Sequence, residues 1–157
     1  MRAHHKLTGQ SGSSLLFRPN LAYFTSWTMR VTVGPWVGSP NTNSVIDVAW
    51  TTGSTQGIDE LDMNPDGSYS IAELAGTPPT GEGYSPSGTV QQAQSYVIQM
   101  SHAGTTTTFS IDGRVVGTEQ THAGAQLFQV ELSVDYRGPT SSTLSVTYRD
   151  FSLKPTG

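Results

Sequence analysis

The segment from Thr105 to Gly117 constrains the fold most, because it joins strand-forming residues to a tight-turn dipeptide. β-Branched and aromatic residues lie on both sides of Asp112-Gly113. Asp-Gly tolerates the positive φ angles of a two-residue hairpin loop. The segment therefore predicts two antiparallel strands connected by a tight turn.

Alternation of apolar and polar residues extends the strand pattern to much of the chain, and this period of two is typical of half-buried strands. The predicted inward-facing sets are Phe128, Val130, Leu132 and Val134; Leu144, Val146 and Tyr148; Trp27, Met29, Val31 and Val33; and Ile46, Val48 and Trp50. A second turn is predicted at Asn64-Pro65-Asp66-Gly67. No helical heptad interrupts these sets, so the fold class is all-β.

The 157 residues suffice for one core and one domain. A Gly/Ser-rich stretch over residues 9–14 has the composition of a flexible linker. It predicts a flexible N-terminal arm over residues 1–14 and a single β-sandwich domain over residues 15–157. Strands separated by turns every 8–12 residues or so indicate a two-sheet antiparallel jelly roll, with an up-and-down barrel as the competing architecture.

Charge and composition exclude several classes of partner. The formal net charge is -4, whereas nucleic-acid binders concentrate Lys and Arg on one face. No segment approaches the roughly 20 apolar residues of a membrane span, and no cysteine is present for a disulfide or thiolate site. The four histidines lack the spacing of metal ligands, and His102 and His122 are predicted to lie in turns because each precedes Ala-Gly. Neither nucleic acid, membrane, metal nor cofactor is therefore expected.

The C-terminal half has a strand that ends in the Asp-Gly hairpin (residues 109–116), then a long strand (127–135) and a closing aromatic-rich strand (144–153). In this order of elements it resembles the concanavalin A-like lectin and glucanase superfamily. The resemblance implies a β-sandwich. It does not fix a function, because that superfamily contains glycanases, lyases, lectins and structural modules.

A laminarinase-type glycosidase of this superfamily would carry Glu-x-Asp-x-Glu or Glu-x-Asp-x-x-Glu on one strand. Glu60 and Asp62 match the first two acidic positions and share a face of the predicted strand. Asn64 and Pro65 occupy the alternative third positions, and neither donates a proton. Retaining hydrolysis needs two carboxyl groups about 5–5.5 Å apart. We therefore expect no catalytic residues and interpret Asp59, Glu60 and Asp62 as solvated charges at a strand edge.

Sugar binding requires exposed aromatic rings, which combine apolar area with polar edges. Trp36 follows Gly34-Pro35, and Tyr84 lies in a Pro- and Gly-rich segment, Gly76 to Gly88, that is predicted to be a long surface loop. Trp36, Tyr84, Glu60 and Asp62 are the predicted carbohydrate-binding residues, whereas Trp27 and Trp50 are predicted to fill the core.

The composition is typical of extracellular and virion proteins, yet the first nine residues lack the apolar run of a secretory signal. This combination predicts a non-enzymatic structural or attachment protein on the surface of a tailed-phage virion, as a capsid decoration or tail-associated module. It would bind other virion proteins, itself as a homo-oligomer, and a host surface glycan. The predicted assembly interface comprises Arg2, His4, His5, Lys6, Pro78 and Pro79. The alternatives are a laminarinase-like glycoside hydrolase and a secreted, extracellular carbohydrate-binding module.

Overall fold

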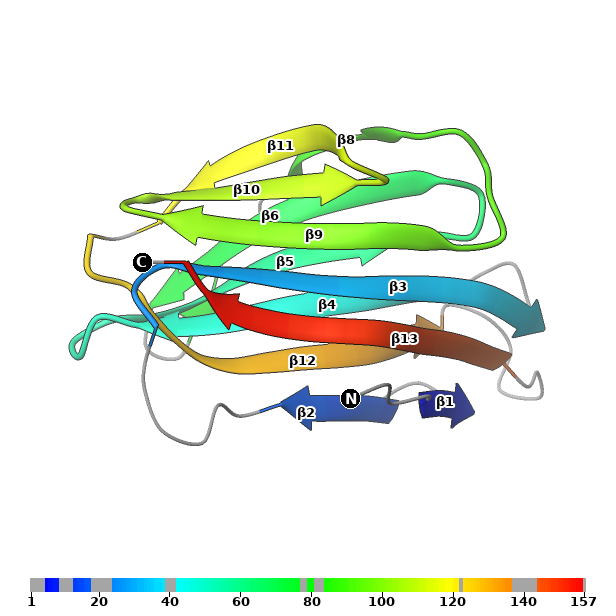
Figure 1. The fold of residues 1–157 in the computed structure, drawn as a ribbon, viewed down its shortest axis with the longest axis horizontal. Helices are drawn as coiled ribbons and strands as arrows, with labels where there is room; N and C mark the ends of the chain where they lie inside the picture. The colour runs from blue at the N-terminus through cyan, green and yellow to red at the C-terminus, as the bar shows by residue number, and fades with distance from the viewer. Residues whose placement is uncertain are drawn as a thin grey trace.

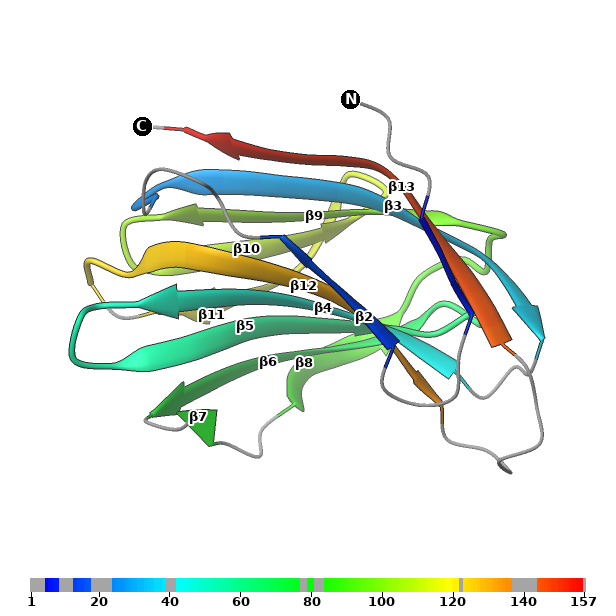
Figure 2. The ribbon, with the colours of Figure 1, turned by 90° about the horizontal axis from the view of Figure 1, so that it is seen from below.

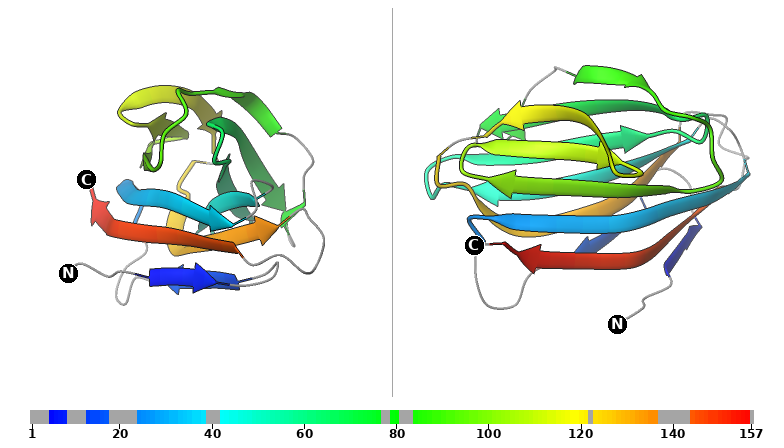
Figure 3. Two further views of the ribbon diagram at one scale, coloured as in Figure 1. Left: turned by 90° about the vertical axis from the view of Figure 1, so that its right-hand side faces the viewer. Right: turned by 45° about the horizontal axis from the view of Figure 1, so that its top comes forward.

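The computed structural model describes residues 5–8, 13–17, 24–38, 42–76, 79–80, 84–121, 123–136 and 144–156. Every regular element in these ranges is a β-strand, and the strands form two antiparallel sheets that lie face to face (Figures 1 and 3). Among the described residues, no helix has the length and hydropathy that crossing a bilayer would need. The all-β sandwich predicted from the sequence is confirmed.

The first sheet contains six strands in the order β1-β13-β3-β9-β10-β11. Their bounds are β1 His5–Thr8, β13 Leu144–Pro155, β3 Trp27–Gly38, β9 Tyr96–Ala103, β10 Thr106–Ile111 and β11 Arg114–Gln120. The two strands farthest apart in the chain, β1 and β13, pair at one edge of this sheet, and β13 also pairs with β3 (Figure 1).

The second sheet has the order β2-β12-β4-β5-β6-β7, and β8 also pairs with β6. Its strands are β2 Ser13–Phe17, β12 Gln126–Tyr136, β4 Thr42–Thr51, β5 Gln56–Met63, β6 Ser68–Gly76, β7 Pro79–Thr80 and β8 Tyr84–Thr89. Seen from below, β12, β4, β5 and β6 lie side by side across this layer (Figure 2).

Both predicted turns are present. Asp112 and Gly113 connect β10 to β11 with φ angles of 50° and 80°, as a two-residue hairpin requires. Asp112 Oδ1 also accepts a hydrogen bond from the Val97 amide at 2.7 Å, which ties the turn to β9. In the turn before β6, Gly67 takes a φ of 87°, and Asp66 Oδ1 accepts from the Ser68 amide at 2.9 Å.

The core consists of alternate residues from the two facing sheets. With Phe128 as the exception, the described members of all four predicted inward sets are nearly or fully buried: Trp27, Met29, Val31, Val33, Val146, Tyr148, Ile46, Val48, Trp50, Val130, Leu132 and Val134. The Tyr148 hydroxyl donates to the Ser133 carbonyl, so β13 of the first sheet is hydrogen-bonded to β12 of the second.

Three local predictions are wrong. Phe128 is only half-buried and lies outside the core, because a bulge between Leu127 and Gln129 makes Leu127 the inward residue. His102 is not in a turn but in β9, where it is buried. The segment Gly76 to Gly88 is not a continuous loop, since it contains β7 and most of β8.

Candidate functional site

Glu60 and Asp62 lie on the face of β5 that points away from the core. Leu61 and Met63, the residues between and after them, are fully buried core residues, so strand alternation places the two carboxyl groups on the opposite, outer face. The predicted shared face is therefore present. The side chains are not solvated edge charges, however, because β5 is a central strand and their exposed fractions are only 8% and 5%.

Two further carboxyl groups lie in register with Glu60. Asp47 of β4 is directly opposite Glu60 of β5, and Glu131 of β12 is directly opposite Asp47. Directly opposed residues of an antiparallel pair have Cβ atoms about 4.5–5.5 Å apart. Three acidic side chains thus form a row across three neighbouring strands, and Asp62 extends it along β5. We call Asp47, Glu60, Asp62 and Glu131 the carboxyl row.

The centre of the carboxyl row holds a proton near neutral pH. Burial first, then the charges of Glu60 and Glu131, raise the pKa of Asp47 to about 8. The proximity of the Glu60 carboxyl group, directly opposite Asp47 on β5, adds to this rise in the pKa of Asp47. Asp47 Oδ1 has no hydrogen-bond partner in the part of the chain that the structure describes. The pair therefore combines a held proton with an oxygen that has no partner within the described residues.

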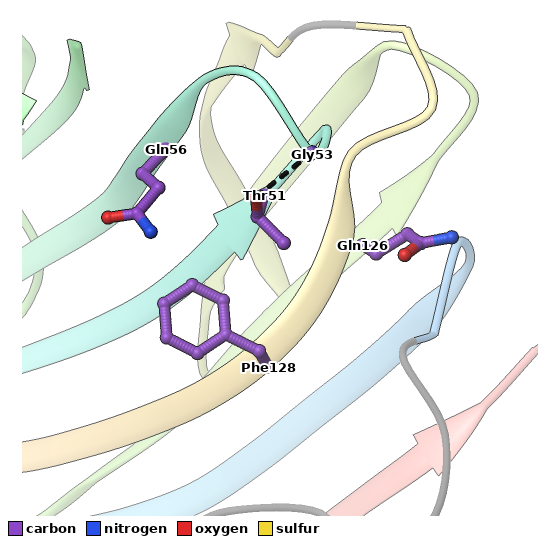
Figure 4. Close-up of a pocket in the computed structure, with 5 residues that line it drawn as sticks. All are labelled: Thr51, Gly53, Gln56, Gln126 and Phe128. Carbon is purple, nitrogen blue, oxygen red and sulfur yellow. Dashed lines mark hydrogen bonds between the residues drawn. The ribbon is translucent and has the colours of Figure 1, made fainter. Parts of the chain in front are cut away.

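A hollow of about 420 Å³ lies on the same outer face, at the end of the β4–β5 hairpin. It is bounded by Thr51, Gly53, Gln56, Gln126 and Phe128 (Figure 4). Phe128 is the extra residue of the β12 bulge, and its half-buried ring faces β4 and β5 rather than the core. We call this feature the hairpin pocket.

A second group of titratable residues lies on the core side of β5, between the sheets. Asp59 Oδ1 accepts from Trp50 Nε1 at 3.1 Å, and Asp59 Oδ2 accepts from Thr107 Oγ1 at 2.5 Å. The Thr107 hydroxyl is also 3.0 Å from His102 Nδ1, and the His102 ring stacks on Trp27. Burial raises the pKa of Asp59 to about 7, against the opposing effect of these two donors. Burial lowers the pKa of His102. This network lies on the core side of β5 and is separated from the carboxyl row by the sheet itself.

The predicted sugar-binding residues are not all brought together. Trp36 belongs to β3 of the first sheet, where its half-buried ring contacts the edge of Tyr96 at a centroid distance of 5.9 Å. Tyr84 begins β8 and is paired with Ala72 of β6, which in turn is opposite Glu60. Glu60 and Asp62 therefore share one face of β5, Tyr84 lies two strands away in register with Glu60, and Trp36 lies on the other sheet.

The predicted arm and interface residues are placed only in part. His5 and Lys6 belong to β1, which pairs with β13, and Pro79 belongs to β7, which pairs with β6. Arg2, His4 and Pro78 lie outside the described residues. The predicted domain boundary at residue 14 falls within β2, and β2 pairs with β12 of the sandwich.

Asp47, Glu131 and Phe128 were not identified as site residues from the sequence. Asp47 lies between Ile46 and Val48, so its outward direction is readable from alternation. Its position opposite Glu60 depends on the pairing of β4 with β5, and no local pattern encodes that register. No three of the described His, Asp or Glu side chains are grouped so as to hold a metal ion.

Two antiparallel sheets packed face to face define the class of this fold, an all-β sandwich. No family model matches the sequence, and no curated protein matches it. Solved structures do match in fold, and the following three each share 9% sequence identity with this chain. A prokaryotic β-1,3-1,4-glucanase (lichenase) derived from a mouse hindgut metagenome has a TM-score of 0.66, with 98% of this chain and 80% of that chain covered.

The κ-carrageenase from Pseudoalteromonas carrageenovora has a TM-score of 0.65, with coverages of 96% and 80%. The carbohydrate-binding module CBM66 from Bacillus subtilis has a TM-score of 0.59, with coverages of 94% and 85%. The prediction of a non-enzymatic protein is contradicted by these comparisons, because the fold is shared with glucanase and carrageenase enzymes. The prediction considered carboxyl groups only on the strand of Glu60 and Asp62 and did not consider those on neighbouring strands.

Proposed function

We propose that the protein is a glycoside hydrolase that cleaves a neutral glycan laid across the outer face of the second sheet. The observation that carries this proposal is the carboxyl row itself, in which Asp47 of β4 lies directly opposite Glu60 of β5 and Asp62 follows two residues later on the same face. Glycoside hydrolysis uses one protonated and one ionised carboxyl group. The carboxyl row places several carboxyl groups on one face of the sheet, and the raised pKa of Asp47 lets that residue keep its proton at neutral pH.

In the proposed reaction Asp47 is the general acid. It gives its proton to the glycosidic oxygen while the bond from that oxygen to the anomeric carbon breaks, and the bonding electron pair stays on the leaving oxygen. Carboxylates on β5, Glu60 and Asp62, stabilise the positive charge that develops on the sugar ring. Water then supplies a hydroxyl group to the anomeric carbon, and its remaining proton restores Asp47. Asp47 thereby donates the proton that Asn64, at the third position of the glycosidase motif, is unable to donate.

The charge distribution supports a neutral substrate. In the ranges for which side chains are described, Lys and Arg occur only on the first sheet: Arg30, Arg114, Arg149 and Lys154. The outer face of the second sheet carries the carboxyl row instead. Like charges repel an anionic polysaccharide from such a face, whereas a neutral chain of sugars pays no such penalty.

The test is release of reducing ends from a panel of polysaccharides, with mixed-linkage β-1,3-1,4-glucan as the neutral substrate and κ-carrageenan as the anionic one. We expect cleavage of the neutral glycan only. Asp47→Asn should lower the rate on the glycan by about 10²–10⁴-fold, the usual contribution of general acid catalysis. The same variant should lose far less on a dinitrophenyl glycoside, because that leaving group departs without a proton.

Glu60→Gln should lose activity on both substrates, which distinguishes its role from that of Asp47. Asp150→Asn is the matched control, since it removes an exposed carboxyl group from β13 of the other sheet. Binding of the glycan with no hydrolysis would overturn the catalytic part of the proposal. Hydrolysis that Glu60→Gln leaves unchanged would overturn the assigned site.

The location on a virion surface and the self-association expected from the sequence stay predictions. Electron microscopy of the particle or lysate fraction that carries the protein is the measurement that checks them.

A further inference from the structure

We propose that the hairpin pocket binds one sugar unit of the same glycan, beyond the linkage that is cleaved. This inference rests on the proposed function, and it adds the requirement that the glycan be long enough to reach the pocket. Its basis is the position and chemistry of the pocket, neither of which the cleavage step uses.

The lining of the hairpin pocket suits an uncharged sugar. It combines an aromatic ring, two primary amides and a hydroxyl group, from Phe128, Gln56, Gln126 and Thr51 (Figure 4). Sugars present C–H faces that pack on aromatic rings and hydroxyl groups that hydrogen-bond to amides. None of the five lining residues is charged, so the pocket offers nothing to neutralise an anionic substituent.

The pocket lies on the same strands as the carboxyl row, at a distance that one sugar does not span. Gln56 precedes Glu60 by four residues on β5, and Thr51 follows Asp47 by four residues on β4. At the rise of a β-strand, four residues correspond to about 13 Å. Both pairs of strand positions give the same separation, so a glycan aligned with the strands reaches the pocket more than one sugar unit away from the carboxyl row.

The pocket is held in place by the backbone around it. Gly53 donates its amide proton to Thr51 Oγ1 at 3.1 Å, and the Thr51 hydroxyl donates to the Thr55 carbonyl at 3.3 Å. Gly53 has a φ of 87°, which only glycine adopts readily. The bulge in β12 then directs Phe128 toward this hairpin. A preformed pocket binds without the cost of ordering its lining residues.

The experiment measures affinity for β-linked gluco-oligosaccharides of increasing length by isothermal titration calorimetry, in a Glu60→Gln background that prevents cleavage. Phe128→Ala should weaken binding of the longer oligosaccharides by about tenfold and leave binding of the disaccharide unchanged. Phe128→Tyr keeps the ring and should retain the affinity. Phe151→Ala removes a half-buried ring from β13 of the other sheet and should change neither value.

Equal affinity of Phe128→Ala and its parent at every length would overturn the inference. An equal loss at every length would also overturn it, because the pocket would then not lie beyond the cleaved linkage. Failure of the proposed function is distinguished by the hydrolysis assay: length-dependent binding through Phe128 without any cleavage would sustain the pocket and refute the hydrolase. Absence of binding at every length would refute both.

Discussion

Replacing Thr107 by Val should destabilise the protein by an amount that depends on pH. Thr107 is fully buried, and its hydroxyl donates to Asp59 Oδ2 at 2.5 Å. Val has nearly the same shape but no hydroxyl group, so the variant creates little cavity. An ionised Asp59 would keep only Trp50 Nε1, 3.1 Å from Oδ1, as the donor that the structure shows. Loss of a hydrogen bond to a charged group costs about 1.5–3 kcal/mol, and loss of one to a neutral group costs about 0.5–1.5 kcal/mol.

The direction of the pH dependence follows from the pKa of Asp59. Burial raises this pKa from 3.8 in the unfolded chain to about 7, so the folded protein keeps a proton that the unfolded chain releases. Its stability therefore falls as the pH rises from about 4 to about 7, and the whole loss is present above 7. Thr107→Val removes a donor that favours the ionised form, so it raises the pKa further and extends the loss to higher pH.

Urea unfolding of wild type and Thr107→Val, about two pH units below and above the pKa of Asp59, measures both quantities. We expect the smaller cost at the lower pH and the larger cost at the higher pH. Thr107→Ser keeps the hydroxyl group and should show no such difference, and Thr108→Val tests the same substitution on the other face of β10. A free-energy difference that is equal at the two pH values would refute the reasoning, because it would mean that Asp59 does not ionise in the folded protein.

Three further predictions concern stability, and each is checked by denaturant unfolding. Gly57→Ala should destabilise by about 1–3 kcal/mol, because a Cβ atom there would lie 2.1 Å from the Trp50 ring and force it to move. Leu132→Ala, at a fully buried core position, should cost about 2–5 kcal/mol through the cavity that it leaves. Asp47→Asn should flatten the fall in stability as the pH rises from about 4 to about 8, because the raised pKa of Asp47 adds a loss over that window that an amide lacks.

The turns and most of the core were predictable because their signals are local. Asp112-Gly113 sets a backbone conformation by itself, and the alternation of Trp27, Met29, Val31 and Val33 gives the inward face of β3 without knowledge of its neighbours. His102 was misplaced by a short distance only. The predicted turn exists, but it begins at Gly104, two residues later. The hydroxyl group of Thr107 hydrogen-bonds to the buried imidazole and so lowers the cost of burying it.

Two of the four residues of the carboxyl row, Glu60 and Asp62, were predictable from the sequence. Glu60 and Asp62 share a face because they are two residues apart, which any strand guarantees. The partnership of Glu60 with Asp47 depends on the register of two strands, and a slip of one residue would have put Asp47 on the core side. Phe128 was misassigned because Leu127 and Phe128 are both apolar. Phe128, two residues before Val130, continues the alternation, and only the bulge makes Leu127 the inward residue instead.

The bulge in β12 has a consequence for insertions and deletions. Gln126 and Leu127 pair with Thr51 and Trp50, and the pairing resumes with Gln129 opposite Ala49. Phe128 therefore has no paired residue on β4. A chain without Phe128 would keep every pair on both sides and every inward residue inward. Central strands ordinarily accept no change of length, because one residue reverses all faces beyond it. In this strand, insertion or deletion of a single codon would add or remove an aromatic side chain on the outer face and leave the core unaltered.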